Sequence, residues 1–185
     1  MKLEVTPLQG GPSPVPALVR RSAFRDARGV FSRLFALEEL APFGWSDGIA
    51  HINHSATPHA GTVRGLHFQE PPHAEMKLVT VLQGKIFDVI VDMRKDSPNR
   101  FLPLTVELSA ETGTALLIPQ GFAHGFQTLT DDVALLYLHS AAYAPAAARG
   151  LRPDDPALSI SWPLPLKHCS EQDRAWPLIG HRQGS

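Results

Sequence analysis

The chain has 185 residues, of which 43% are hydrophobic and 19% are charged, and its formal net charge is −1 at pH 7. This composition is typical of one globular domain, and a charge near zero gives no electrostatic basis for binding nucleic acid or a membrane surface. The single cysteine, Cys169, excludes an intrachain disulfide and a cysteine-based zinc site, and no apolar run reaches transmembrane length. We therefore expect a cytoplasmic protein without nucleic-acid or membrane partners.

The first third of the chain predicts short elements, because proline (17 residues) and glycine (14 residues) interrupt it often. Residues 1–8 predict an edge strand that leads into a Gly/Pro/Ser turn cluster. Residues 24–35 predict a turn followed by a strand, and 37–40 predict one helical turn that stops before Pro42. Residues 49–63 are polar and rich in histidine, and we interpret His54, His59 and His73 as loop residues.

The central stretch, residues 64–92, contains two runs rich in β-branched and aromatic residues, 78–82 and 86–91. Gly84 lies at their junction and can supply the positive φ of a tight turn, so these runs predict an antiparallel hairpin. In the second run, alternation separates the face of Ile86 and Asp88 from the face of Phe87 and Val89.

The rest of the chain continues this pattern of short strands. Residues 101–108 and 114–118 each predict a strand, and 126–129 with 133–138 predict a second hairpin. Beyond Tyr143 the sequence is irregular, apart from a short helical turn at 170–174. Strands spaced 8–12 residues apart predict one all-β domain over residues 1–185, a sandwich or barrel of the jelly-roll kind.

Clustered histidines raise the question of a metal site. The spacing of Gly113, Pro119, Gly121 and His124 resembles the second sequence motif of the cupins, a superfamily of double-stranded β-helix proteins that includes many metal enzymes. In the first cupin motif, however, Gln69 stands where a second metal-binding histidine follows the position of His67. Because a catalytic metal needs about three strong protein ligands, we expect no metal and no other cofactor.

An ordered set of motifs resembles one cupin family, the dTDP-4-dehydrorhamnose 3,5-epimerases. The resemblance covers about residues 22–178, and its motifs follow in the family's order. They are Val63-Arg64-Gly65-Leu66-His67-Phe68-Gln69, Lys77-Leu78-Val79, Phe87-Asp88-Val89-Ile90-Val91-Asp92, Glu107-Leu108-Ser109-Ala110, Ile118-Pro119-Gln120-Gly121-Phe122-Ala123-His124-Gly125-Phe126, Leu136-Tyr137, Asp155-Pro156-Ala157-Leu158, Trp162-Pro163 and Ser170-Glu171-Gln172-Asp173-Arg174.

The resemblance implies a cupin-type jelly roll that inverts C3 and C5 of a nucleotide-linked 4-keto-6-deoxyhexose in deoxysugar biosynthesis. It implies that His67 is the base, that Asp173 pairs with it, that Tyr137 is the opposing acid, and that Lys77 contacts the sugar. The segment 144–185 then completes the site. Substrate-binding positions fall on Arg28, Arg33, His51, Asn53, Arg64, Gln69, His124 and Tyr143.

The chemistry of such a reaction needs these residue types. A proton on a carbon beside a ketone is acidic because the carbanion delocalises as an enolate, and an imidazole titrating near neutrality is an efficient base. A carboxylate behind the imidazole fixes its tautomer, which is the role implied for Asp173. A cation such as Lys77 stabilises the enolate oxygen, and a phenol on the other face can return a proton.

Each of these residues also has a simpler explanation, because His67 can be a hydrogen-bonded core histidine and Tyr137 an ordinary core tyrosine beside Val133 and Leu135. His124 can cap a turn, and Asp173 can lie on a surface helix. Several positions depart from the family pattern: Arg33 replaces Glu, His51 replaces Gln, Leu138 replaces Lys, Ala148 replaces Glu and Gln172 replaces Lys. These departures leave open a single epimerase, a ketoisomerase or a ligand-binding cupin without catalysis.

The resemblance also implies a homodimer, in which the N-terminal strand crosses to the partner's sheet. Leu3, Val5 and Leu8 alternate in residues 1–8, and a terminal strand must find a pairing partner. We therefore expect residues 1–8 to be exchanged in a dimer that binds a nucleotide sugar, most simply a dTDP-linked one.

Overall fold

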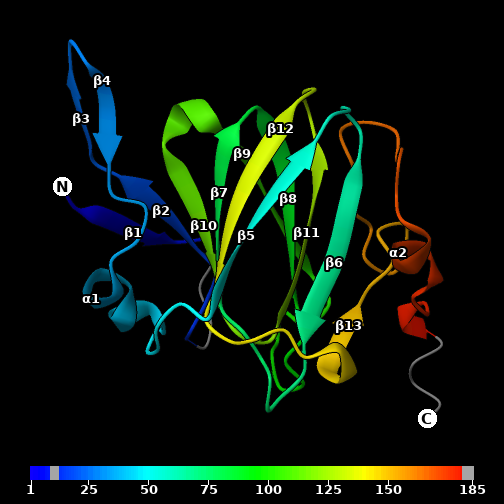
Figure 1. Cartoon of the computed structure of the whole chain (residues 1–185). Helices are drawn as coiled ribbons and strands as arrows, with labels where there is room; N and C mark the ends of the chain where they lie inside the picture. Colours follow the sequence, from blue (N-terminus) through cyan, green and yellow to red (C-terminus); the bar gives the residue numbers. More distant parts are fainter. Residues whose placement is uncertain (9–12, 181–185) are drawn as a thin grey trace.

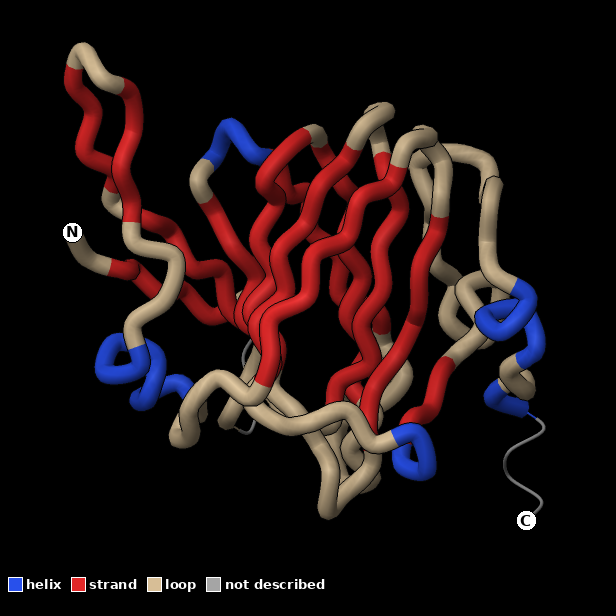
Figure 2. The backbone as a smooth tube through the Cα atoms, in the orientation of Figure 1, coloured by secondary structure: helices blue, strands red, loops and turns tan. Residues whose placement is uncertain are grey.

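Two antiparallel sheets packed face to face form the body of the protein in the computed structural model, which describes residues 1–8 and 13–180 (Figures 1 and 2). The six-stranded sheet has the order β1 (Leu3–Pro7), β2 (Ala17–Arg21), β10 (Thr114–Ile118), β7 (Lys77–Gln83), β12 (Val133–His139) and β5 (His51–Thr57). The five-stranded sheet has the order β13 (Ala148–Gly150), β6 (Val63–Gln69), β11 (Phe122–Thr128), β8 (Lys85–Asp92) and β9 (Pro103–Ser109). The all-β jelly roll expected from the strand spacing is confirmed.

In the described part of the chain, helical structure is limited to short segments at the edges of the sheets (Figure 2). The α-helices are α1 (Leu37–Leu40) and α2 (Glu171–Ala175), and the 3₁₀ turns are η1 (Ala41–Phe43), η2 (Ala110–Thr112) and η3 (Pro145–Ala147). Both α-helices lie where the sequence predicts helical turns. Within residues 1–8 and 13–180, no helix is long and apolar enough to cross a bilayer.

Three buried clusters cover the faces of the two sheets, which explains why strands such as β8 are apolar on both faces. The first lies between the sheets, and Ile86 and Ile90 of β8 belong to it. The other face of β8, including Val89 and Val91, packs against the C-terminal segment through residues such as Leu158. A third cluster on the outer face of the six-stranded sheet contains Leu3, Ala17, Val19, Leu40, Trp45, Met76, Leu78, Ala115, Leu117 and Leu138. The alternation predicted for β8 is therefore confirmed, with both faces covered.

Both predicted hairpins are wrong in their pairing. Gly84 does make the tight turn, with φ +76°, but β7 pairs with β10 and β12 while β8 pairs with β9 and β11. The second turn likewise leads from β11 in one sheet to β12 in the other. In a jelly roll, successive strands can alternate between sheets, and the period-2 pattern of a strand does not reveal which neighbour it pairs with.

Three further segments differ from the prediction. A strand, β5, occupies much of segment 49–63, whose histidines were interpreted as loop residues. The strand is polar because its inner face lines a cavity and its outer face is exposed. Residues 24–35 contain a two-stranded hairpin, β3 (Ala23–Asp26) and β4 (Gly29–Ser32), in place of one strand. The short strand β13 interrupts the irregular C-terminal segment and pairs with β6.

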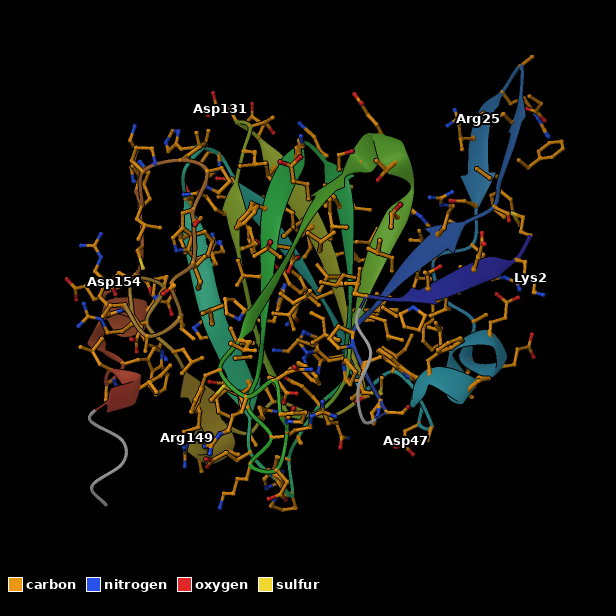
Figure 3. All side chains as sticks on the ribbon, turned by 180° about the vertical axis from the view of Figure 1, so that it is seen from behind. Lys2, Arg25, Asp47, Asp131, Arg149 and Asp154 are labelled. Atoms are coloured by element: carbon orange, nitrogen blue, oxygen red, sulfur yellow. The ribbon has the colours of Figure 1, made fainter. Side chains whose placement is uncertain are left out.

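The β3–β4 hairpin extends away from the sandwich (Figure 1). Figure 3, the reverse view, shows Arg25 on this hairpin and Asp154 of the C-terminal segment on the other side of the molecule. The N-terminal strand β1 pairs antiparallel with β2 of its own chain and lies at the edge of the six-stranded sheet, as an edge strand should. Exchange of residues 1–8 between subunits remains a prediction.

Candidate active site

A cavity of about 870 Å³ opens between the two sheets. One wall comes from β6 and β11 of the five-stranded sheet, and the other from β5, β7 and β12 of the six-stranded sheet. The segment around residues 168–173 lies at its rim. The cavity brings together seven of the predicted site residues, namely Asn53, Arg64, His67, Lys77, His124, Tyr137 and Asp173.

The predicted imidazole–carboxylate pair is formed by two segments far apart in the chain. His67 of β6 places Nε2 at 2.5 Å from Oδ1 of Asp173, which lies on α2. The His67 side chain is 47% exposed, whereas that of Asp173 is 5% exposed, so the imidazole faces the cavity and the carboxylate lies behind it. This arrangement leaves the other ring nitrogen, Nδ1, available for proton transfer.

The surroundings of Asp173 keep it ionised. Burial alone would raise the pKa of this carboxyl, but the hydrogen bond and charge of His67, with the Gly65 amide and the Ser170 hydroxyl, together bring the pKa below its ordinary value. The Gly65 N–H donates to Oδ2 at 3.3 Å, and Ser170 caps α2 by accepting from the Asp173 N–H at 3.0 Å. A carboxylate rather than a carboxylic acid therefore supports His67.

Gly65 is the backbone position that permits this arrangement. Its φ is +104°, and a Cβ there would come within 2.6 Å of the His124 carbonyl oxygen and 2.7 Å of the Gly125 Cα. The register between β6 and β11 shifts at the same place, between His124 and Phe126. Only glycine meets both demands, so the Arg-Gly-Leu-His motif contains a residue needed for backbone geometry as well as one suited to chemistry.

Lys77 of β7 is held in place from two sides. Its Nζ donates to the His67 carbonyl oxygen at 3.1 Å and lies 3.1 Å from Oε1 of Glu75. Both side chains are 8% exposed, so the ammonium group is a largely desolvated charge at the cavity wall. Electrostatic stabilisation of a developing oxyanion is stronger in such surroundings than in water.

A second imidazole–carboxylate contact lies deeper in the sandwich. Nε2 of His124 is 2.9 Å from Oδ1 of Asp88, with 5% and 0% of the side chains exposed. Among the described residues neither carboxylate oxygen of Asp88 has an aligned hydrogen-bond partner. Burial raises the pKa of Asp88, and the nearby His124 offsets this only in part. His124, which lines the cavity, is therefore backed by a buried carboxyl whose pKa is raised.

Tyr137 of β12 faces the cavity from the wall opposite His67. Burial raises the pKa of its phenol, and the charge of Asp88 raises it further. The phenol therefore carries its proton at neutral pH. Its ring lies edge-on to that of His124, with 6.2 Å between centroids.

Five predicted substrate-binding residues do not line the cavity of this chain. Arg28 lies at the turn of the β3–β4 hairpin, is 86% exposed and pairs with Asp26. Arg33 pairs with Glu39 at 3.1 Å, and Tyr143 is 64% exposed in the loop after β12.

The remaining two, Gln69 and His51, lie outside the cavity lining. Gln69 is 3% exposed, and its amide joins two loops by donating to the carbonyl oxygens of His73 and Ala142 and accepting from the Ala144 N–H. His51 stacks on His139, with 4.3 Å between ring centroids. Of the departures from the family pattern, Leu138 packs in the outer core, whereas Gln172 lines the cavity.

Three residues at this site, Glu75, Asp88 and His139, were not among the predicted site residues. His139 could have been found, because it lies two residues after Tyr137 and therefore on the same face of β12. Asp88 also had a signal, a carboxylate in the middle of an apolar strand. Glu75 stands at the position of the glutamate in the first cupin motif, but its partners Lys77 and His139 are brought to it only in the folded chain.

Residues 15–181 match the model of a known family, described as dTDP-4-dehydrorhamnose 3,5-epimerase. The chain belongs to this family. A dTDP-4-dehydrorhamnose 3,5-epimerase of Sinorhizobium fredii is 42% identical over 163 residues, which are 88% of this chain and 84% of the relative.

Solved structures agree with the family assignment. A dTDP-4-dehydrorhamnose 3,5-epimerase of Bacillus anthracis, with TDP and pyrophosphate bound, has a TM-score of 0.87 and 36% identity, covering 95% of this chain and 100% of that one. A 3′-monoepimerase of Streptomyces bikiniensis, in complex with dTDP-quinovose, has a TM-score of 0.84 and 32% identity, covering 95% and 91%. The epimerase family thus includes enzymes described as acting at one carbon.

Proposed function

We propose that the protein is an epimerase that inverts C3 and C5 of a dTDP-linked 4-keto-6-deoxyhexose in deoxysugar biosynthesis. One observation carries this proposal beyond the family resemblance. An imidazole backed by a carboxylate and a protonated phenol line the same cavity from opposite sheets, His67 from β6 and Tyr137 from β12. Inversion at carbon requires a base on one face of the sugar and an acid on the other, and these residues lie on opposite walls.

Each inversion proceeds in two steps, in which one proton is removed and another is delivered. His67 removes the proton from the carbon beside the C4 ketone, and the electron pair of that C–H bond moves onto the ketone oxygen to give an enolate. Lys77 stabilises the oxyanion, and Asp173 stabilises the imidazolium. Tyr137 then gives its proton to the opposite face of the carbon, and the C4 ketone forms again. His67 releases its proton to solvent and Tyr137 takes one up, which restores both side chains.

The remaining residues of the cavity suit binding of the substrate. Arg64, Asn53 and His124 supply polar groups along the cavity, and the Arg64 guanidinium suits a diphosphate. We propose that Arg28 and Arg33 belong to the same binding surface in a homodimer. His67 and Lys77 supply base and cation without a cofactor, and Gln69 takes the place of a metal-binding histidine. We place the enzyme in the cytoplasm.

A single epimerisation is the second candidate, because one similar structure is described as a 3′-monoepimerase. A ketoisomerase lacks such a similar structure, and a ligand-binding cupin without catalysis would not need the two proton-transfer groups that line the cavity.

Incubation with dTDP-4-keto-6-deoxyglucose in deuterated water, followed by NMR, tests the proposal. Deuterium at C3 and C5 with inversion at both carbons is the expected result. Deuterium at one carbon indicates a monoepimerase, and a protein that leaves both carbons unlabelled is not an epimerase of this substrate.

A further inference from the structure

Three side chains form a row across the cavity wall of the six-stranded sheet. The strand register pairs His51 of β5 with His139 of β12, and His139 in turn with Lys77 of β7. Neighbouring strands lie about 4.8 Å apart, so these side chains are adjacent on one face. Tyr137 precedes His139 by two residues and shares that face. His139 therefore lies between His51, which has no role in the proposed reaction, and Lys77, which stabilises the oxyanion.

Glu75 fixes the orientation of His139. Its Oε2 lies 3.3 Å from His139 Nδ1, while its Oε1 lies 3.1 Å from Lys77 Nζ. Burial opposes ionisation of Glu75, but the hydrogen bond from His139 and the charge of Lys77 outweigh it, so the pKa of the carboxyl lies below its ordinary value. An ionised carboxylate accepts a hydrogen bond from the Nδ1–H group. In the tautomer that carries its proton on Nδ1, Nε2 keeps its lone pair and can accept a hydrogen bond.

The ring of His139 is also held from the side. It stacks on His51 with 4.3 Å between centroids and an interplanar angle of 14°. The side chain is 12% exposed and lines the cavity. Within the described part of the chain, Nε2 makes no hydrogen bond, so an oriented acceptor faces the cavity beside Lys77.

We propose that His139, oriented by Glu75, is a further substrate-contacting residue that accepts a hydrogen bond from the C3 hydroxyl of the sugar. This inference rests on the proposed function, in which Lys77 holds the oxygen at C4. In a 4-keto-6-deoxyhexose, the hydroxyl nearest to that oxygen is on C3, because C5 carries the methyl group and the ring oxygen. His139 is therefore placed to control the position of C3, and Glu75 is its positioning residue.

The sharpest test compares deuterium exchange at C3 and at C5 in His139→Phe, which keeps an aromatic ring on His51 but removes the acceptor. Exchange at C3 should fall about tenfold relative to exchange at C5, which corresponds to the loss of one buried hydrogen bond. His139→Gln, whose amide oxygen can accept a hydrogen bond, should restore part of the C3 exchange. His54→Phe changes an exposed histidine on the outer face of β5 and should leave the ratio unchanged.

The outcomes separate this inference from the proposed function. Wild-type protein that exchanges neither carbon overturns both. Wild-type protein that exchanges both carbons, with an unchanged C3-to-C5 ratio in His139→Phe and His139→Gln, overturns the role of His139 alone. Thermal unfolding of each variant identifies one that fails to fold. The ratio in His139→Phe decides the matter, because a general loss of structure lowers exchange at both carbons alike. If the phenylalanine variant does not fold, His139→Leu, which also lacks an acceptor, takes its place.

Discussion

His67 and Tyr137 occupy opposite walls of one cavity, so their loss should interrupt the proposed reaction at different steps. His67→Asn removes the base, and we expect both exchange and epimerised product to fall on the order of 10²–10⁴-fold. Tyr137→Phe leaves His67, Asp173 and Lys77 in place, so the enolate forms and recaptures a proton on its original face. NMR in deuterated water should then find labelled but uninverted sugar.

Phenylalanine preserves the ring volume of Tyr137, so little packing energy is lost with its hydroxyl. Inverted sugar produced by Tyr137→Phe at the wild-type rate would show that another group delivers the proton.

Asp88 should make the protein less stable as the pH rises. Burial raises the folded-state pKa of this carboxyl above its ordinary value of 3.8, so the folded protein holds the proton more tightly than the unfolded chain does. Its contribution to stability is thus complete below the unfolded pKa and is lost as the pH rises through the folded one. We expect the unfolding free energy of Asp88→Asn, minus that of the wild type, to increase with pH.

Urea denaturation of Asp88→Asn and wild type between pH 4 and pH 8 measures this difference. The wild-type curve by itself is not informative, because Asp173 has a lowered pKa and contributes with the opposite sign, losing its stabilisation as the pH falls. A difference that stays constant or decreases with rising pH contradicts the assignment of Asp88 as a destabilising buried acid.

Individual site residues could be predicted when a local motif contains them. His67, Lys77, His124 and Tyr137 belong to such motifs, and all four line the cavity. Glu75 matches the glutamate of the first cupin motif, but its contact with His139 could not be predicted, because the two residues are 64 positions apart in the chain. Such a contact exists only once β7 and β12 are paired in the folded sheet.

Among the elements, the bulge of β6 against β11 depends on Gly65. An alanine at this position must adopt a φ of +104° and also bring its Cβ within 2.6 Å of a backbone oxygen. We expect Gly65→Ala to lower the unfolding free energy by about 2–6 kcal/mol, the sum of backbone strain and steric overlap. Guanidinium denaturation measures this change.

Gly48→Ala provides the matched control, because a Cβ at Gly48 meets no atom within 4 Å. Its unfolding free energy should stay within about 0.5 kcal/mol of the wild-type value. Equal stability of the Gly65 and Gly48 variants would mean that β6 can relax without the bulge.

Element positions were more predictable than element partners. The runs that form β7 and β8 alternate clearly, and the turn at Gly84 has the backbone conformation that the sequence indicated. Their pairing was not encoded locally, because a tight turn can join strands of one sheet or lead from one sheet to the other. The strand β5 was missed for another reason: its inner residues are polar because they line the cavity, which weakens the hydrophobic pattern.

The β3–β4 hairpin has exposed apolar side chains and carries Arg28, a predicted substrate-binding residue that does not line the cavity of its own chain. Phe24, Val30 and Phe31 are 57%, 56% and 67% exposed. Apolar side chains gathered on one projection are typical of an interaction surface. Arg28, at the same hairpin, lies outside the cavity of its own chain. A second copy of this chain resolves both points if each hairpin covers its partner and brings Arg28 to the partner's cavity.

Sedimentation should therefore give about twice the 20.2 kDa mass of the chain, and a mixing experiment tests the shared site. We expect Arg28→Ala alone to lower kcat/KM about tenfold or more, from the loss of a charge-assisted contact with the substrate. Co-refolding Arg28→Ala with inactive His67→Asn gives mixed dimers in which one cavity has His67 and receives Arg28 from the other subunit. With random pairing in a two-fold dimer, about a quarter of the wild-type activity should return. A monomer at micromolar concentration, or mixed dimers no more active than their parents, would contradict the shared site.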